Sequence, residues 1–127
     1  MNAIVAVFIG GGLGSLARYG MSILLTKPFA TGFPYATLAS NTISSLLIGL
    51  LAGSQLLGKD AASNLWKPLM AIGFCGGFST FSAFSLETIE LAKNSMMSQA
   101  LLNGFSNLVL CLGATLAGMW IGRYWLA

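Results

Sequence analysis

The chain has 127 residues, of which 56% are hydrophobic and only 7% charged, and its mean hydropathy is +0.82. An average soluble domain is about a quarter charged, so this composition excludes a soluble globular protein with a polar surface. The net charge is +3, but the six basic residues are scattered and form no patch of the kind that binds nucleic acid. We expect one small membrane domain over residues 1–127.

Four hydrophobic segments follow one another along the chain. Uncharged runs cover residues 1–17, 28–58, 68–86 and 94–122. Because a helix needs roughly 20 apolar residues to cross a bilayer, these runs predict an all-α membrane protein of four transmembrane helices. The predicted helices span about 3–25, 34–57, 68–92 and 99–124. The first run has no basic n-region and no cleavage site, so we interpret it as a span and not as a signal peptide.

The first span contains the segment GGGLGSLARYG at residues 10–20. The glycine spacing of a dinucleotide-binding loop fails because position 15 is serine. Arg18 is the charged residue of this segment. Two interpretations stay open: its long side chain anchors the helix end at the membrane interface, or it forms a cationic vestibule that attracts an anion.

The second span contains TLASNTISSLLIG at residues 37–49, with Asn41 among several serines. An amide inside hydrocarbon must find a partner, and bonding between helices explains many such residues. The two N–H donors of Asn41 also make it a possible ligand for an anion.

The third span contains GFCGGFSTFSAFS at residues 73–85. Glycine is costly in a helix and hydroxyls compete for backbone bonds, so this segment, and Gly76 and Gly77 in it, predicts a helix break. Broken backbone survives at membrane depth only when it is buried in protein or lines a cavity. Its freed carbonyls can coordinate a hard cation such as sodium, while the hydroxyls of Thr80 and Ser82 stay free to donate.

Two aromatic and two acidic residues follow the predicted break. Phe81 and Phe84 are three residues apart and share one helix face, where core packing and contact with an anion are both possible. The edge of a phenyl ring is positive, which suits an anion. Glu87 and Glu90 come next and would solvate a vestibule, or drive proton exchange if one of them were deep; their closeness to Lys93 favours the interface.

The fourth span carries a polar stripe. Each of its four residues follows the previous one after four positions, which places them on one helix face, and the stripe predicts a hydrated path. The stripe consists of Asn103, Asn107, Cys111 and Thr115.

The two cysteines give no sign of a metal or redox site. Cys75 and Cys111 are far apart and match no metal or redox spacing.

The basic residues give no clear orientation, and the small bundle is expected to oligomerise. With four spans, Lys59, Lys67 and Arg123 lie on one side of the membrane, and Arg18, Lys27 and Lys93 on the other. This balance permits insertion in both directions and antiparallel pairing, while a weakly biased single topology remains the alternative. Small residues four apart allow helices to approach closely. These pairs are Gly10/Gly14, Gly49/Gly53, Gly73/Gly77 and Gly118/Gly122.

The three quoted segments, in this order in a four-span chain, resemble the Fluc (CrcB) family of fluoride channels over essentially the whole length. The resemblance implies an antiparallel, dual-topology homodimer that exports fluoride passively across a bacterial inner membrane. Two pores are expected along the subunit interface. A structural sodium ion at the dimer centre would be held by the backbone carbonyls of Gly76 and Ser79.

The resemblance also implies roles for individual side chains. Phe81 and Phe84 would face the ion with their ring edges, and Asn41 would be a pore amide. Further pore residues would be the hydroxyls of Thr80 and Ser82, the vestibule cation Arg18, and Asn103, Asn107 and Cys111 of the polar stripe. The sequence departs from the family pattern at Ser44, Phe78, Ser79, Ala83 and Cys111. Ser79 should not disturb a carbonyl ligand, but the thiol of Cys111 is a weaker donor than the common serine.

Three other classes of protein fit less well. A small proton-coupled multidrug exporter would also be a four-helix dimer, but it needs a carboxylate deep in its first span, and residues 1–17 contain none. A membrane adaptor without transport would leave the polar stripe unexplained. An enzyme is the least favoured class, because the chain has no histidine, no deep pair of carboxylates and no activated nucleophile.

Overall fold

A computed structural model describes residues 1–26, 32–57 and 64–126 of the chain. Within these residues the structure has four largely helical spans, each long and apolar enough to cross a membrane. The expected all-helical, multi-pass architecture is therefore confirmed. The elements are α1 (Ala3–Thr26), α2 (Tyr35–Gly53), η1 (Lys67–Cys75), α3 (Gly76–Phe78), α4 (Phe81–Lys93), α5 (Met97–Ile121) and η2 (Gly122–Leu126).

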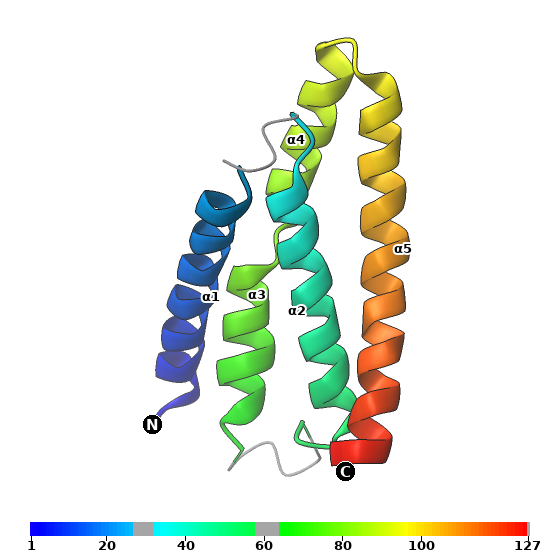
Figure 1. Ribbon diagram of the computed structural model, residues 1–127. Coiled ribbons are helices and arrows are strands. Elements are labelled where there is room, and N and C mark those ends of the chain that lie inside the picture. The colour runs from blue at the N-terminus through cyan, green and yellow to red at the C-terminus, as the bar shows by residue number, and fades with distance from the viewer. Residues whose placement is uncertain (27–31, 58–63, 127) are drawn as a thin grey trace.

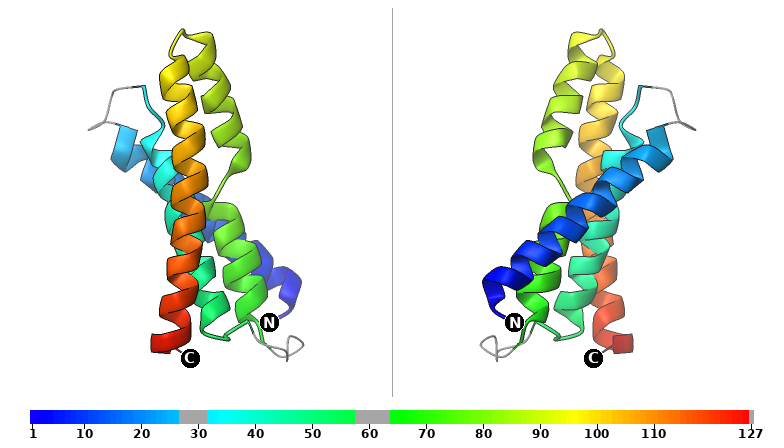
Figure 2. Two further views of the ribbon diagram at one scale, coloured as in Figure 1. Left: turned by 90° about the vertical axis from the view of Figure 1, so that its right-hand side faces the viewer. Right: turned by 90° about the vertical axis from the view of Figure 1, so that its left-hand side faces the viewer.

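The third span consists of three elements. It begins with η1, which is wound as a π-helix, continues through α3 and resumes as α4 after a break. Both termini lie at one end of the bundle, and the α4–α5 turn lies at the other (Figure 1). Helix α1 crosses the third span obliquely (Figure 2). The predicted positions of Lys27 and Lys59 lie outside the described residues.

Glycines bring the helices into contact in two pairs, α1 with the third span and α2 with α5. A Cβ added to Gly14 would lie 2.1 Å from the Phe74 carbonyl oxygen, and one added to Gly49 would lie 2.3 Å from that of Thr115. These helices can pack backbone to backbone only because the side chains are absent. All eight glycines of the predicted small-residue pairs make such contacts to backbone atoms of the same chain.

The interior of this bundle is small and partly polar. Most large apolar side chains point outward, as is expected for a protein surrounded by lipid. Hydroxyls and amides fill much of the space between the helices instead. The buried polar residues within the spans are Thr37, Ser40, Ser44, Asn103 and Asn107.

The second span ends earlier than the predicted limit at residue 57. Ser54 still donates its N–H to the Leu50 carbonyl, but its hydroxyl donates to the carbonyl of Leu51. Gln55 then adopts a left-handed conformation with φ 61°, which a helix cannot continue through. The helix therefore stops at Gly53.

Candidate functional site

The third span is interrupted near its middle by two residues with extended backbone. Ser79 has φ −81° and ψ 157°, and Thr80 has φ −154° and ψ 119°. The expected break is therefore present, but Gly76 and Gly77 remain helical and the hydroxyl residues form the break. Thr80 also starts the next helix, because its Oγ1 accepts the N–H of Ala83 at 3.1 Å.

Backbone carbonyls next to the break accept hydrogen bonds from side chains, and the Cys75 carbonyl also still accepts the Ser79 N–H at 3.0 Å. The Cys75 carbonyl accepts hydrogen bonds from the hydroxyls of Ser79 (2.8 Å) and Ser44 (3.0 Å). The Gly77 carbonyl accepts Nε of Arg18 at 3.1 Å. Within the described chain no donor reaches the carbonyls of Gly76 and Ser79, the two groups that the resemblance assigns to sodium.

Asn41 of α2 bonds to the broken backbone through both ends of its amide. Its Oδ1 accepts the N–H of Thr80 at 2.7 Å, and its Nδ2 donates to the Thr80 carbonyl at 3.3 Å. The second N–H of Asn41 is available for Oδ1 of Asn107, 3.0 Å away on α5. The amide thus joins three spans, as the interpretation of Asn41 as a bond between helices requires.

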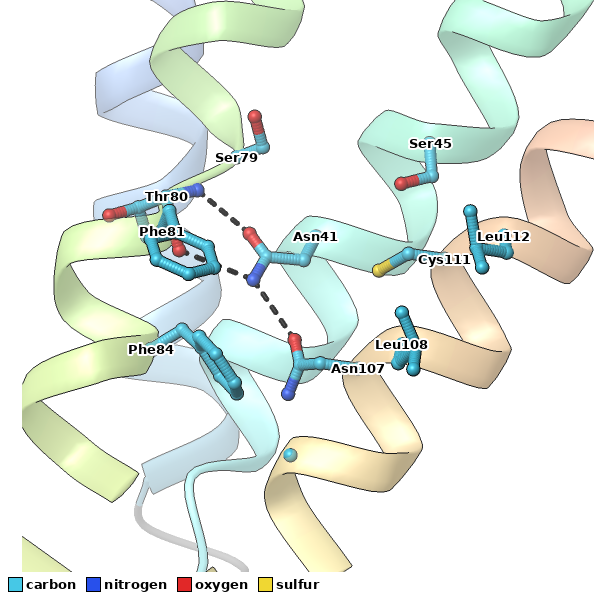
Figure 3. Close-up of a pocket in the computed structure, with 11 residues that line it drawn as sticks. Asn41, Ser45, Ser79, Thr80, Phe81, Phe84, Asn107, Leu108, Cys111 and Leu112 are labelled. Atoms are coloured by element: carbon cyan, nitrogen blue, oxygen red, sulfur yellow. Dashed lines mark hydrogen bonds between the residues drawn. The ribbon is translucent and has the colours of Figure 1, made fainter. Parts of the chain in front are cut away.

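A groove of about 490 Å³ lies beside the break (Figure 3). Phe81 and Phe84 form one wall with ring centroids 5.4 Å apart, and Phe81 is 79% exposed. Polar groups of α2, α5 and the break form much of the rest. Those of the predicted residues that line the groove are Asn41, Ser79, Thr80, Phe81, Phe84, Asn107 and Cys111.

The hydroxyls of Thr80 and Ser82 share one hydrogen bond. Their oxygens lie 3.1 Å apart, and either can be the donor. Whichever donates, the proton of the other hydroxyl is not used in this pair. The break therefore presents one hydroxyl proton that is free to meet a further acceptor.

The polar stripe of α5 divides into groove-lining and buried residues. Asn107 and Cys111 line the groove. Asn103 is 0% exposed and lies behind the groove, where it accepts Nδ2 of Asn107 and donates to Thr88. Thr115 bonds to backbone carbonyls of Cys111 and Ser45.

A second cavity of about 320 Å³ lies on the other side of Thr80, which lines both. Arg18 and Glu87 line this second cavity. Arg18 is not at the end of the first span, because α1 continues for two turns beyond it. Glu87 accepts the hydroxyl of Thr37 at 2.7 Å and is half-buried, whereas Glu90 is exposed.

Several lining residues were not among the predicted site residues, and two of them carry a signal in the sequence. Ser45 lines the groove, and its position four residues after Asn41 is the signal that would have placed it on the same face. Thr37 lines the second cavity, and its spacing from Ser40 and Ser44 marks a hydroxyl stripe on α2.

Comparisons with known proteins agree with the resemblance. The family model described as "CrcB-like protein, Camphor Resistance (CrcB)" matches residues 5–119. A protein of Coxiella burnetii (strain Dugway 5J108-111) is 39% identical over 123 residues, 97% of this chain and 98% of the relative. A protein of Caulobacter sp. (strain K31) is 37% identical over 123 residues, 97% of this chain and 96% of the relative. Both relatives bear the name "Fluoride-specific ion channel FluC".

Proposed function

The chain belongs to the CrcB-like family and is by homology a fluoride-specific ion channel, not an enzyme, and we propose how it conducts. Fluoride passes down its electrochemical gradient through two pores along the interface of an antiparallel homodimer. Each pore uses the groove beside the break of the third span. The bacterial relatives support a position in the inner membrane of a bacterium.

The groove is the observation that carries this proposal, because it combines hydroxyl donors with aromatic edges. Fluoride is small and strongly hydrated, and removing its water in a medium of low dielectric is costly unless other donors replace the water. Thr80 lines the groove and Ser82 does not, so the free proton of the Thr80/Ser82 pair would be one such donor at the edge of the groove. The positive edges of Phe81 and Phe84 add weak stabilisation beside it.

The other groove residues supply further weak sites along the path. Asn107 and Cys111 continue the polar wall on α5, and Asn41 meets it at the level of the break. Several weak sites suit a channel, because an ion that binds too tightly does not leave. Chloride is larger and less able to use closely spaced donors, so it is excluded by fit and by poorer solvation.

Arg18 acts as the vestibule cation. It lines the second cavity, which adjoins the groove at Thr80. A positive charge held at the Gly77 carbonyl raises the local concentration of anions next to the break.

Asn103 does not contact the ion directly, since it is 0% exposed. It acts from behind the groove.

A second subunit is needed to cover polar groups at the middle of the span. Ser82 and Gly76 are exposed there, and lipid does not satisfy a hydroxyl or a free carbonyl. A copy placed on this face would close the open side of the groove. An antiparallel arrangement is supported by the balanced basic residues, which permit insertion in both directions.

The sodium ion would lie where the free carbonyls of Gly76 and Ser79 meet those of the second copy. Carbonyl oxygens suit a hard cation. A Cβ built on Gly76 meets no atom within 4 Å, so this surface is open to a partner. When bound, the ion supplies a fixed positive charge and links the two subunits.

Ion efflux from liposomes that contain the purified protein tests the proposal. We expect rapid fluoride release without a proton gradient and negligible chloride release. Equal rates for the two anions would contradict selective conduction. Release that requires a proton gradient would instead favour a coupled exporter in which Glu87 takes part.

A further inference from the structure

A closed chain of side-chain hydrogen bonds runs behind the groove and returns to the segment from which it starts. It begins at the N–H of Thr80 and ends at the carbonyl of Phe84, so both ends are backbone groups around the start of α4. Between them it crosses to α2 and α5 and back to α4. The bonds, donor first, are Thr80 N to Asn41 Oδ1 (2.7 Å), Asn41 Nδ2 to Asn107 Oδ1 (3.0 Å), Asn107 Nδ2 to Asn103 Oδ1 (3.0 Å), Asn103 Nδ2 to Thr88 Oγ1 (2.9 Å) and Thr88 Oγ1 to the Phe84 carbonyl (2.7 Å).

The direction of this chain is fixed by its ends. A backbone N–H can only donate, so Asn41 must present its oxygen to Thr80 and its nitrogen to Asn107. A backbone carbonyl can only accept, so Thr88 must turn its hydroxyl proton to Phe84 and accept from Asn103. Each amide between these ends then has only one orientation that completes the chain.

The segment between the two ends carries both phenylalanines of the groove. Ser79 and Thr80 are extended; the Ser79 N–H still bonds to the Cys75 carbonyl at 3.0 Å, but the Thr80 N–H bonds to Asn41 and not to a helical carbonyl, so the helical bonding ends there. The start of α4 is held instead by the capping bond from the Ala83 N–H to Thr80 and by the chain of amide hydrogen bonds. In a medium of low dielectric such connected bonds reinforce one another, and removal of one leaves buried groups without partners.

Two residues of this chain of hydrogen bonds lie outside the groove. Asn103 is fully buried, and Thr88 is one turn beyond Phe84 on α4. Neither lines the groove or the second cavity. An effect of these residues on conduction must therefore act through Asn107, Asn41 and the backbone of α4.

We propose that Asn103 and Thr88 are positioning residues that fix the Thr80–Phe84 segment through this closed chain and so set the selectivity of the groove for fluoride. The proposal rests on the proposed fluoride conduction. A phenyl edge stabilises an anion only from the right position, and a shift of about 0.5 Å is enough to spoil a preorganised site. The chain of hydrogen bonds positions both phenylalanines through their backbone, although neither phenyl ring is bonded to it.

The test compares fluoride and chloride efflux from liposomes for four full-length variants. Thr88→Val keeps the shape of the side chain but removes its donor and acceptor, whereas Thr88→Ser keeps both. Asn103→Leu removes the amide from the middle of the chain at nearly constant size. Thr42→Val is the matched control, because among the described residues the Thr42 hydroxyl bonds only to the carbonyl of Leu38 in its own helix, at 2.7 Å.

We expect Thr88→Val and Asn103→Leu to lower fluoride efflux at least tenfold and to lower the fluoride-to-chloride ratio, while size-exclusion chromatography shows the same assembly as the unmodified protein. Thr88→Ser should keep at least half of the unmodified efflux, and Thr42→Val should match it. If Thr88→Val does not assemble, the fluoride efflux and the fluoride-to-chloride ratio of Asn103→Leu decide whether the positioning role holds.

Unchanged efflux and ratio in assembled Thr88→Val and Asn103→Leu would overturn the positioning role. The same holds if Thr88→Ser is as inactive as Thr88→Val, because the hydroxyl would then not be the group that acts. Absence of selective efflux from the unmodified protein would instead overturn the proposed conduction itself.

Discussion

The side-chain amide of Asn41 and the backbone of Thr80 are joined by two hydrogen bonds, one in each direction. The amide bonds to Thr80 as the backbone of a neighbouring β-strand would. The Thr80 N–H donates to Oδ1 at 2.7 Å, and Nδ2 donates to the Thr80 carbonyl at 3.3 Å. The break can exist at membrane depth because the Asn41 amide bonds to both the N–H and the carbonyl of Thr80.

Asn41→Asp should abolish fluoride conduction and destabilise the protein. A carboxylate can still accept the Thr80 N–H, but it cannot donate to the Thr80 carbonyl or to Asn107. Loss of these bonds leaves the Thr80 carbonyl and the Asn107 amide oxygen without these donors, at a cost of up to about 1–3 kcal/mol for each. Thermal unfolding in detergent and efflux from liposomes measure the two effects. Asn2→Asp, at an exposed position before α1, serves as control, and an equal effect there would contradict the role of the pair.

Replacing Phe81 or Phe84 by isoleucine should reduce fluoride efflux at least tenfold while the protein still assembles. Isoleucine keeps most of the apolar volume but has no positive ring edge to face an anion. Phe8→Ile is the matched control, because Phe8 is also highly exposed but lines neither cavity. Unchanged efflux with both pore variants would show that the rings only pack.

Sodium should stabilise the assembled protein in preference to other monovalent cations. The free carbonyls of Gly76 and Ser79 are hard ligands, and an ion bound only by the folded dimer raises its stability by mass action. The measurement is thermal unfolding in sodium, potassium and choline chloride at equal ionic strength. Because the proposed ligand is a backbone carbonyl, Ser79→Ala should retain the preference for sodium. Equal midpoints in the three salts would argue against a sodium site.

Gly14→Ala and Gly12→Ala should have opposite effects on stability. A Cβ at Gly14 would lie 2.1 Å from the Phe74 carbonyl oxygen, so α1 would have to move away from the third span. A Cβ at Gly12 meets nothing within 4 Å, and alanine there favours the helix by about 0.5–1 kcal/mol. Thermal unfolding separates the two, and a stable Gly14→Ala protein would mean that the close packing is not required.

The sequence predicted the four spans and the break because both depend on local patterns. Long apolar runs define the helices, and the hydroxyls of Ser79 and Thr80 interrupt one of them. The groove residues were also predicted in large part, through helical spacing and resemblance. The bond from Arg18 to Gly77 could not be predicted, because it depends on how α1 crosses the third span.

The burial of Asn103 illustrates the same limit. Periodicity correctly placed it on one face of α5 with Asn107 and Cys111. That face is wide, however: Asn103 is buried where α5 meets Thr88 of α4, while the groove opens beside Asn107 and Cys111. Which residue of a stripe is accessible depends on the packing of neighbouring helices and not on spacing.

Cys111→Ser should leave fluoride efflux unchanged or raise it up to about threefold, because a hydroxyl donates a stronger hydrogen bond than a thiol. Cys111 lines the groove and is partly exposed, so its donor faces the proposed path. Cys111→Val, which has a similar size and no donor, should lower efflux below that of the unmodified protein. Cys75→Ala is a control for loss of a thiol, because Cys75 is buried and lines neither cavity. If the serine and valine variants conduct alike, position 111 contributes only its shape to the wall, and the donors that replace water must come from the break and from Asn107.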